Sequence, residues 1–265
     1  MKLVSNLVTV ALIGGVIFGA YHIHSAEKAE EQAFETARQT ALNAPDPFLE
    51  LDRFRSAIGD YGKSCYVFAE ASCKRRVDTE NELVIAGAKK GSVPALVFLF
   101  DTGSKWPLIK YTDLPHDESQ RLGLRLISLA ENAPVTKENA ALFSEAAQLL
   151  KYSTHTAKSI DLYVKAWQTG APWAASGLAY IYDEILNDKA RAYFWYVRAR
   201  NIPVGTESFQ DLSAEEKLTL QSKAHDTSRV NILFKAPVAE NKGLSCNGSQ
   251  SKSLGLAISA VFGSD

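Results

Sequence analysis

The chain begins with a long apolar run. Between Leu3 and Ile23 the only polar side chains belong to Ser5, Asn6, Thr9 and His22. At about 1.5 Å rise per residue, a helix of this length spans roughly 30 Å, which matches the hydrocarbon core of a bilayer. The pattern predicts a single transmembrane helix over residues 3–23. Lys2 precedes the run and acidic residues follow it, so the positive-inside bias predicts a cytoplasmic amino terminus and an exported remainder.

A cleaved signal peptide is the alternative for residues 1–23, because its positive start and apolar centre look the same. Cleavage requires small residues at positions −3 and −1. Cleavage after Ala26 places His24 at −3, and cleavage after Ala20 places Phe18 there. We therefore favour the uncleaved anchor, which predicts a single-pass inner-membrane protein whose carboxy-terminal domain lies in the periplasm. His22 and His24 are interpreted as interfacial residues without a ligand role.

Helical patterns continue after the apolar run. Residues 24–47 are rich in helix formers with a thin apolar stripe, which predicts a helical stalk or linker that ends at the prolines around Asp46. Residues 48–235 show amphipathic stretches of helical period, separated by short Gly, Pro and Asn/Asp breaks. Residues 236–265 become polar and then briefly apolar, which predicts a partly ordered tail. The fold class expected from these patterns is all-α.

Three local motifs predict where helices begin. Thr79–Glu82 and Ser213–Glu216 both have the capping-box form, in which a hydroxyl and a later carboxylate bond the free amides of a first turn. Asp188 stands ahead of an apolar periodic run and is a candidate capping residue.

Two segments of the chain superimpose on a glycine. Gly91 and Gly170 are each followed by alanine at +4 and leucine at +8. A glycine can take the left-handed conformation that closes one helix, and Pro172 suits the first turn of the next. Beyond Gly170, the side chains of Ala174, Leu178 and Tyr182 share one face of a helix. The pattern predicts helix hairpins.

These hairpins resemble the Sel-one-like family of short tetratricopeptide-like repeats. The second helix reads Asp188-Lys-Ala-Arg-Ala-Tyr-Phe-Trp-Tyr-Val-Arg-Ala199, and its relative upstream reads Lys158-Ser-Ile-Asp-Leu-Tyr-Val-Lys-Ala166. Residues 158–199 carry the likeness best, residues 83–103 carry a fainter copy, and residues 121–130 look like another second helix. The family's Gly-x-Gly-Val loop after Tyr182 is missing, and Ala179 replaces a glycine. The resemblance implies a solenoid-like repeat domain that acts as an adaptor or scaffold.

Composition and motifs argue against an enzyme and against a nucleic-acid partner. The net charge is −1, so no overall basic surface is available to hold a polyanion. The sequence contains no nucleophile elbow, no phosphate-binding glycine loop and no metal-ligand spacing around His116, His155 or His225. We therefore expect no cofactor and no metal.

One motif keeps a hydrolase as an alternative. Asp101-Thr102-Gly103 resembles the Asp-Thr-Gly motif of aspartic proteases, in which two such aspartates share a proton across the attacking water. The chain has a single copy. We interpret Asp101 as the end of a helix in the fainter repeat, and the aspartic-type hydrolase remains the alternative from another functional class.

The three cysteines are relevant because disulfides persist in exported proteins. On one helix the Cα atoms of Cys65 and Cys73 would lie about 12 Å apart, beyond the roughly 7 Å limit for a bridge. A bond between them therefore requires an intervening turn. The alternatives are this bridge, with Cys246 unpaired in a Ser/Gly-rich stretch, or three cysteines that are free or paired differently.

The candidate binding residues lie on a second stripe of the helix that follows Gly170. Trp173, Tyr180 and Glu184 combine large amphipathic rings with a carboxylate, which suits a protein interface on the concave side of a solenoid. The alternative is that both rings pack on the preceding hairpin. The predicted function is a membrane-anchored, exported adaptor or scaffold that binds another protein. A second possibility is a periplasmic immunity protein that neutralises a secreted phospholipase or cell-wall hydrolase.

Overall fold

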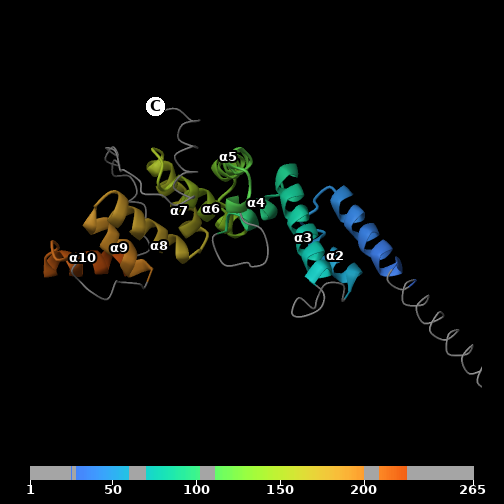
Figure 1. Ribbon diagram of the computed structural model, residues 1–265. Coiled ribbons are helices and arrows are strands. Elements are labelled where there is room, and N and C mark those ends of the chain that lie inside the picture. The colour runs from blue at the N-terminus through green and yellow to red at the C-terminus, as the bar shows by residue number, and fades with distance from the viewer. Residues whose placement is uncertain (1–24, 26–27, 60–69, 102–110, 200–208, 226–265) are drawn as a thin grey trace, which may run out of the picture. The chain divides into compact units, whose positions relative to one another are not determined.

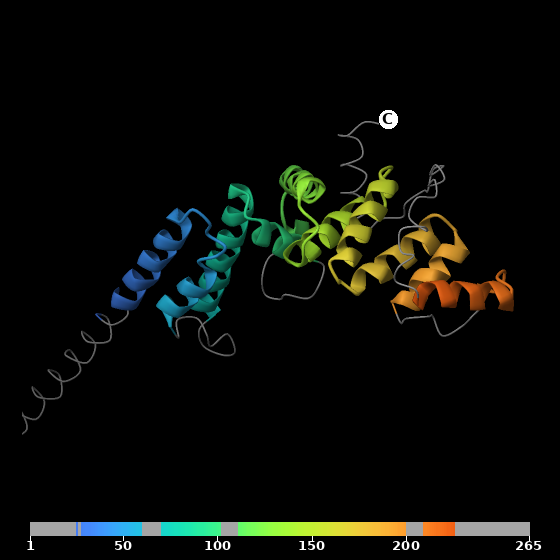
Figure 2. The same cartoon turned by 180° about the vertical axis from the view of Figure 1, so that it is seen from behind.

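The structure is a computed structural model that describes Ser25 and residues 28–59, 70–101, 111–199 and 209–225. Within these residues all regular structure is helical, which confirms the all-α prediction for the described part of the chain (Figures 1 and 2). The chain divides into two compact units: the described residues of unit 1 end at Ala95, and unit 2 begins at Leu96. Each unit is considered by itself below.

The predicted membrane span lies outside the described residues. Within the described part, no helix combines the length and the apolar character that crossing a bilayer requires. The anchor over residues 3–23 therefore stays a prediction, as does the tail over residues 236–265.

Unit 1 contains a helix over residues 28–43, then α2 (Leu51–Ile58), α3 (Glu70–Lys90) and the start of α4 (Val93–Phe100). Side chains from the first three helices form its core: Phe34, Ala41, Leu51, Phe54, Ile58 and Leu83. At the centre, the rings of Phe34 and Phe54 meet edge to face with centroids 5.6 Å apart. One aromatic side chain per helix therefore joins the 28–43 helix to α2.

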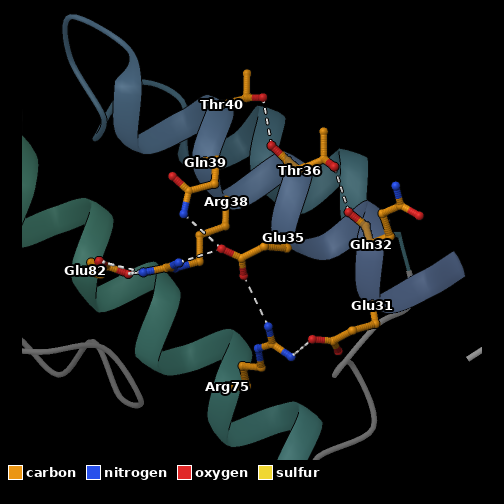
Figure 3. A network of polar contacts seen from close by, with 9 residues as sticks. All are labelled: Glu31, Gln32, Glu35, Thr36, Arg38, Gln39, Thr40, Arg75 and Glu82. Carbon is orange, nitrogen blue, oxygen red and sulfur yellow. Dashed lines mark hydrogen bonds and ion pairs between the residues drawn. The ribbon is translucent and has the colours of Figure 1, made fainter. Parts of the chain in front are cut away.

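The stalk interpretation of residues 24–47 does not describe the helix over residues 28–43, which is packed into unit 1. A thin apolar stripe is sufficient to attach this helix to unit 1, because its large side chain Phe34 is only 1% exposed. A polar network beside this stripe reaches α3 (Figure 3): Arg38 donates to both carboxylate oxygens of Glu82, at 2.9 Å each, and Arg75 bonds Glu31 and Glu35. The guanidinium of Arg75 also lies over the Phe34 ring, 4.7 Å from its centroid.

The predicted helix start at Thr79–Glu82 is wrong, because α3 is continuous from Glu70 to Lys90. Thr79 and Glu80 are buried at 4% and 5% exposure in the middle of this helix. The carboxylate of Glu80 accepts from Arg55 at 2.7 Å and from Arg76 at 3.0 Å. The carboxylate of the box, Glu82, is engaged by Arg38, 44 residues earlier, rather than by an amide of a first turn.

Unit 2 is a succession of helices in which each contacts the next along the chain (Figures 1 and 2). Short η1 (Tyr111–Asp113) and η2 (Lys137–Asn139) lie beside the longer elements. The longer elements are α5 (His116–Asn132), α6 (Ala140–Leu150), α7 (Thr156–Gln168), α8 (Trp173–Tyr180), the π-helical η3 (Ile181–Ile185), α9 (Lys189–Arg198) and α10 (Ala214–His225).

The superposition on two glycines is confirmed in backbone detail. Gly91 and Gly170 both have φ 93°, the left-handed conformation that glycine adopts without strain. The next amide in each case bonds back five residues, from Ser92 to Gly87 at 3.0 Å and from Ala171 to Ala166 at 3.2 Å. Both helix ends are therefore the same Schellman motif. The alanines at +4 and the leucines at +8 are all fully buried: Ala95, Leu99, Ala174 and Leu178.

The glycine loop that the Sel-one-like pattern places after Tyr182 is replaced by a different local structure. Instead of a glycine loop, the chain widens into η3, and Asn187 takes φ 51° where a glycine would be expected. Asparagine is among the few residues that tolerate this region. The side chain of Asp188 then accepts from the amide of Arg191 at 3.0 Å, which confirms the predicted cap of α9.

The Ser213–Glu216 capping box is also confirmed. The amide of Ser213 donates to the Glu216 carboxylate at 2.8 Å, and the amide of Glu216 donates to the Ser213 hydroxyl at 3.2 Å. The helix it opens, α10, packs against α9. Arg198 donates from Nε to the carbonyl of Ala224 at 3.2 Å, and Gln221 donates to the hydroxyl of Tyr193 at 2.7 Å.

Candidate partner-binding surface

Two pairs of side chains join α6 to α8. The indole N–H of Trp173 donates to the hydroxyl of Ser144 at 3.0 Å. The hydroxyls of Tyr152, just beyond the end of α6, and Tyr180 lie 2.9 Å apart. The earlier residue of α6 pairs with the earlier residue of α8, and the later with the later. The two helices therefore run parallel to each other. First helices of successive hairpins have this relationship in a repeat array. We call the face that they share the α6/α8 surface, defined by Ser144, Gln148, Lys151, Tyr152, Tyr163, Trp173, Tyr180 and Glu184.

The middle of the α6/α8 surface is closely packed around Tyr163 of α7. Its hydroxyl donates to Gln148 at 2.7 Å. A Cβ atom added to Gly177 would approach the Tyr163 ring to 2.5 Å, so the glycine leaves room for the ring. Burial, followed by the charge of Glu145, raises the pKa of the Tyr163 hydroxyl well above its ordinary value. The hydroxyl therefore stays protonated and acts as a donor.

A lysine lies against both tyrosines. The ammonium of Lys151 is 4.7 Å from the ring centroid of Tyr152 and 4.8 Å from that of Tyr180. The two rings meet edge to face, with centroids 6.2 Å apart and an interplanar angle of 89°. This geometry presents aromatic faces to the cation, an arrangement that is attractive through the ring quadrupole.

The structure combines features of both interpretations of the Trp173 stripe. Trp173 contacts the preceding hairpin through its N–H, yet the side chain is 55% exposed. Tyr180 is half-buried against Tyr152, while Glu184 on η3 is exposed. The N–H bond fixes the edge of the indole, and its face remains accessible to a partner. Binding by these three residues remains a prediction.

A buried carboxylate stabilises the end of this surface beside Glu184. Asp183, 6% exposed, accepts from the ammonium of Lys189 at 2.6 Å and from the hydroxyl of Tyr196 at 3.3 Å. Burial, with the charge of Asp183, raises the pKa of Tyr196 to about 12. The ion pair with Lys189 thus neutralises Asp183 within the fold.

No family model, curated protein or solved structure matches this chain. The Sel-one-like resemblance therefore rests on residues 158–199 and 83–103 alone and stays a prediction. Two features are repeated within the chain: the helix ends at Gly91 and Gly170, and the parallel helices α6 and α8. They do not assign the chain to a family.

The other candidate residues do not join this surface. The amide of Asp101 donates to Val97 at 2.9 Å, which continues α4, and the following Thr102 and Gly103 lie outside the described residues. The hydrolase interpretation stays an untested alternative. Cys73 is disulfide-bonded; Cys65 lies outside the described residues, so that pairing stays a prediction. Among the residues that the structure describes, no group of His, Cys, Asp and Glu side chains could hold a metal ion.

Sequence reasoning missed the half of the surface that α6 supplies. Ser144, Gln148 and Tyr152 recur at intervals of four through the apolar stretch Ala-Ala-Leu-Phe-Ser-Glu-Ala-Ala-Gln-Leu-Leu-Lys-Tyr. Polar and aromatic side chains at helical spacing in such a stretch indicate a second face that meets another element, and Ser144 is indeed buried against Trp173. This spacing was the available signal, but the partner helix could not be inferred from it.

Unit 1 has a separate apolar groove between the 28–43 helix and α2, with a volume of about 710 Å³. The hydroxyls of Thr36 and Thr40 bond carbonyls of their own helix at 2.7 and 2.8 Å (Figure 3). Both threonines line the groove without leaving their hydroxyls unsatisfied. Alanines, Phe54 and the side chains of Gln32, Glu50 and Arg53 complete its lining, which is mainly apolar and contains none of the predicted site residues.

Proposed function

We propose that this chain is an exported, membrane-anchored helical-repeat protein that acts as an adaptor or scaffold by binding another protein through the α6/α8 surface. The supporting observation is the exposed face of Trp173 on two parallel helices. A large aromatic side chain held rigidly at a surface is the kind of group that contributes most to protein interfaces. Its N–H bond to Ser144 reduces the conformational freedom that binding would otherwise remove.

The proposed location follows from the sequence. Residues 3–23 would cross the inner membrane once and place both units in the periplasm. The Sel-one-like resemblance of residues 158–199 supports the same kind of role, since it implies protein binding rather than catalysis.

The test is capture of the partner by the full-length protein. The tagged chain is solubilised gently from its native host, and co-purified proteins are quantified by mass spectrometry beside the Trp173→Ala variant. Leu218→Ala is the matched control, because Leu218 is another exposed apolar residue, 67% exposed on α10. We expect Trp173→Ala to deplete a stoichiometric partner and Leu218→Ala to retain it.

The identity of the partner decides between the two binding roles. An envelope component supports the scaffold, and a secreted toxin identifies the immunity function. Equal capture by the Trp173→Ala variant shows that another surface binds. If no partner is captured and Asp101→Asn abolishes the cellular phenotype, the binding proposal is wrong and the hydrolase alternative is favoured.

A further inference from the structure

Polar side chains in the middle of the α6/α8 surface bind one another, whereas its two ends are exposed. Tyr163 is held by Gln148, and Tyr180 by Tyr152 and Lys151. Among the described residues, the side chain of Trp173 at one end makes a single polar contact, through its N–H. Glu184 at the other end is exposed on the same stripe. A partner therefore gains new polar contacts at the ends.

The open face of Trp173 suits a cation. Indole is the best of the protein side chains for cation–π attraction, and rings elsewhere in unit 2 already bind cations in this way. Arg198 lies 4.5 Å from the ring centroid of Phe194, and Lys151 lies over two tyrosines. In the part of the chain that the structure describes, no cation lies over Trp173. Its exposed face is available for a cation from outside.

The carboxylate of Glu184 also suits a cation. Within the described ranges Glu184 forms no ion pair, and Lys189, which is close in sequence, is engaged by Asp183 at 2.6 Å. The negative charge therefore remains available at the exposed end of the surface. A guanidinium or an ammonium from a partner would form a hydrogen-bonded ion pair there without displacing any described contact.

We infer that the partner presents a basic segment, with one cationic side chain over Trp173 and a second at Glu184. This inference rests on the proposed function. Eleven residues of helix separate the two ends, which corresponds to about 16 Å. An extended segment rises roughly 3.3 Å per residue and places alternate side chains on one face, so two cations that face this surface stand four residues apart, and their long side chains span the remaining distance. Lys151 lies between the two ends and repels a third cation, so the intervening residues are neutral or acidic.

The test uses the full-length protein in detergent and synthetic probes rather than the natural partner. The probe is a fluorescent extended peptide of about twelve residues, with arginines at positions i and i+4, which share one face, in a neutral background. Two further peptides replace both arginines by glutamine or by glutamate. Fluorescence anisotropy measures each Kd. We expect the arginine peptide to bind about tenfold more tightly than the glutamine peptide, and the glutamate peptide to bind most weakly.

Variants assign the two contacts. Trp173→Ala is expected to weaken binding of the arginine peptide about tenfold, and Trp173→Phe less. Glu184→Gln is expected to weaken it about threefold and to reduce its salt dependence. Glu215→Gln, at an exposed glutamate on α10, is the control and should leave the Kd unchanged. Circular dichroism of each variant establishes that the fold is retained.

The outcomes separate this inference from the proposed function. If all three peptides bind equally, or Glu184→Gln has no effect on the arginine peptide, the basic-segment inference is overturned. The proposed function would still stand if Trp173→Ala depletes the captured cellular partner. If the arginine peptide binds as expected but Trp173→Ala leaves cellular capture intact, the surface has the inferred chemistry and the proposed function is wrong.

Discussion

The hydroxyls of Tyr152 and Tyr180 lie 2.9 Å apart, although 28 positions separate the two residues in the sequence. This contact and the bond between Trp173 and Ser144 set the register of α6 against α8. That register places Lys151, just after α6, over the ring of Tyr180, which lies between Trp173 and Glu184 on the α8–η3 stretch. A change in register would separate the two ends from the lysine between them.

Removing the tyrosine pair is expected to weaken unit 2 cooperatively. Tyr180→Phe keeps the ring but loses a hydrogen bond, which should lower the free energy of unfolding by about 1 kcal/mol. Tyr152→Phe should have a similar effect, and the double variant should lose less than the sum because both single variants remove the same bond. Urea unfolding of the four proteins measures this cycle. Strictly additive losses would show that the two hydroxyls do not interact in solution.

Gly170 is expected to tolerate asparagine better than alanine. Its φ of 93° is strained for a residue with a Cβ atom, while nothing lies within 4 Å of the position that atom would occupy. Gly170→Ala should therefore destabilise the protein by about 1–2 kcal/mol through backbone strain alone. Gly170→Asn should lose less, since asparagine adopts left-handed conformations more readily. Thermal unfolding of both variants tests this order, and equal losses would point to another cause.

Gly177 should not tolerate a larger side chain, for a different reason. Here a Cβ atom would meet the ring of Tyr163 at 2.5 Å, so the ring or a helix has to move. Gly177→Ala is expected to lower the free energy of unfolding by about 1–3 kcal/mol. Ser176→Ala, at the adjacent half-buried position, is the control and should change little. A neutral Gly177→Ala would mean that Tyr163 has room to move aside.

The stability of unit 1 should fall in acid because of Glu80. Burial opposes ionisation of this carboxyl, but hydrogen bonds and charge from Arg55 and Arg76 outweigh it, so the pKa lies below its ordinary value of 4.5. The stabilisation is fully present above about pH 4.5 and is lost as the pH falls through the lowered pKa, because the unfolded state binds the proton first.

Comparison with a variant isolates this contribution. Glu80→Gln should be less stable than the parent protein by about 2 kcal/mol at pH 7, and the difference should shrink toward pH 3. Arg53→Gln removes an exposed ion pair with Glu50 and should change stability by less than about 0.5 kcal/mol. Urea midpoints between pH 7 and pH 3 provide the measurement. A difference that stays constant over this range would assign the acid sensitivity to other groups.

The Ser213–Glu216 capping box at the start of α10 should limit local unfolding of that helix. Ser213→Ala removes the hydroxyl that accepts from the amide of Glu216, and loss of such a cap weakens a helix by about 1 kcal/mol. Amide hydrogen exchange in α10 should accelerate about fivefold, while exchange in α6 and α7 stays unchanged. Ser222→Ala, exposed in the same helix, is the control. Equal acceleration in both variants would contradict a capping role.

Local features were predictable because their partners lie within a few residues. Asp188 and Ser213 cap helices through amides three residues away, and Gly170 ends a helix through its own backbone freedom. Thr79 has the same local form as Ser213, yet it lies within α3. Its box partner Glu82 is bound by Arg38, 44 residues earlier. Local spacing predicts a cap only where no distant side chain engages the same groups.

Tertiary contacts account for the remaining differences. The sequence shows only a thin stripe over residues 28–43, and nothing in it indicates that Phe54 would cover Phe34. The same reason explains why Trp173 and Tyr180 were recognised while Ser144 and Tyr152 were not. The periodicity of one helix is enough to recognise a stripe of side chains on it. Which other helix lies beside that stripe is determined by tertiary packing, which the periodicity does not show.

If residues 3–23 cross a membrane as predicted, the attachment of the 28–43 helix shortens the tether between that span and unit 1. A free helical stalk over residues 24–47 would hold the domain about 36 Å from the end of the predicted span. With residues 28–43 fixed to α2 and α3, only residues 24–27 connect that span to unit 1, a reach of at most about 17 Å. Unit 1 would then stay beside the lipid headgroups, and the molecules it meets most often would be those confined to the same membrane.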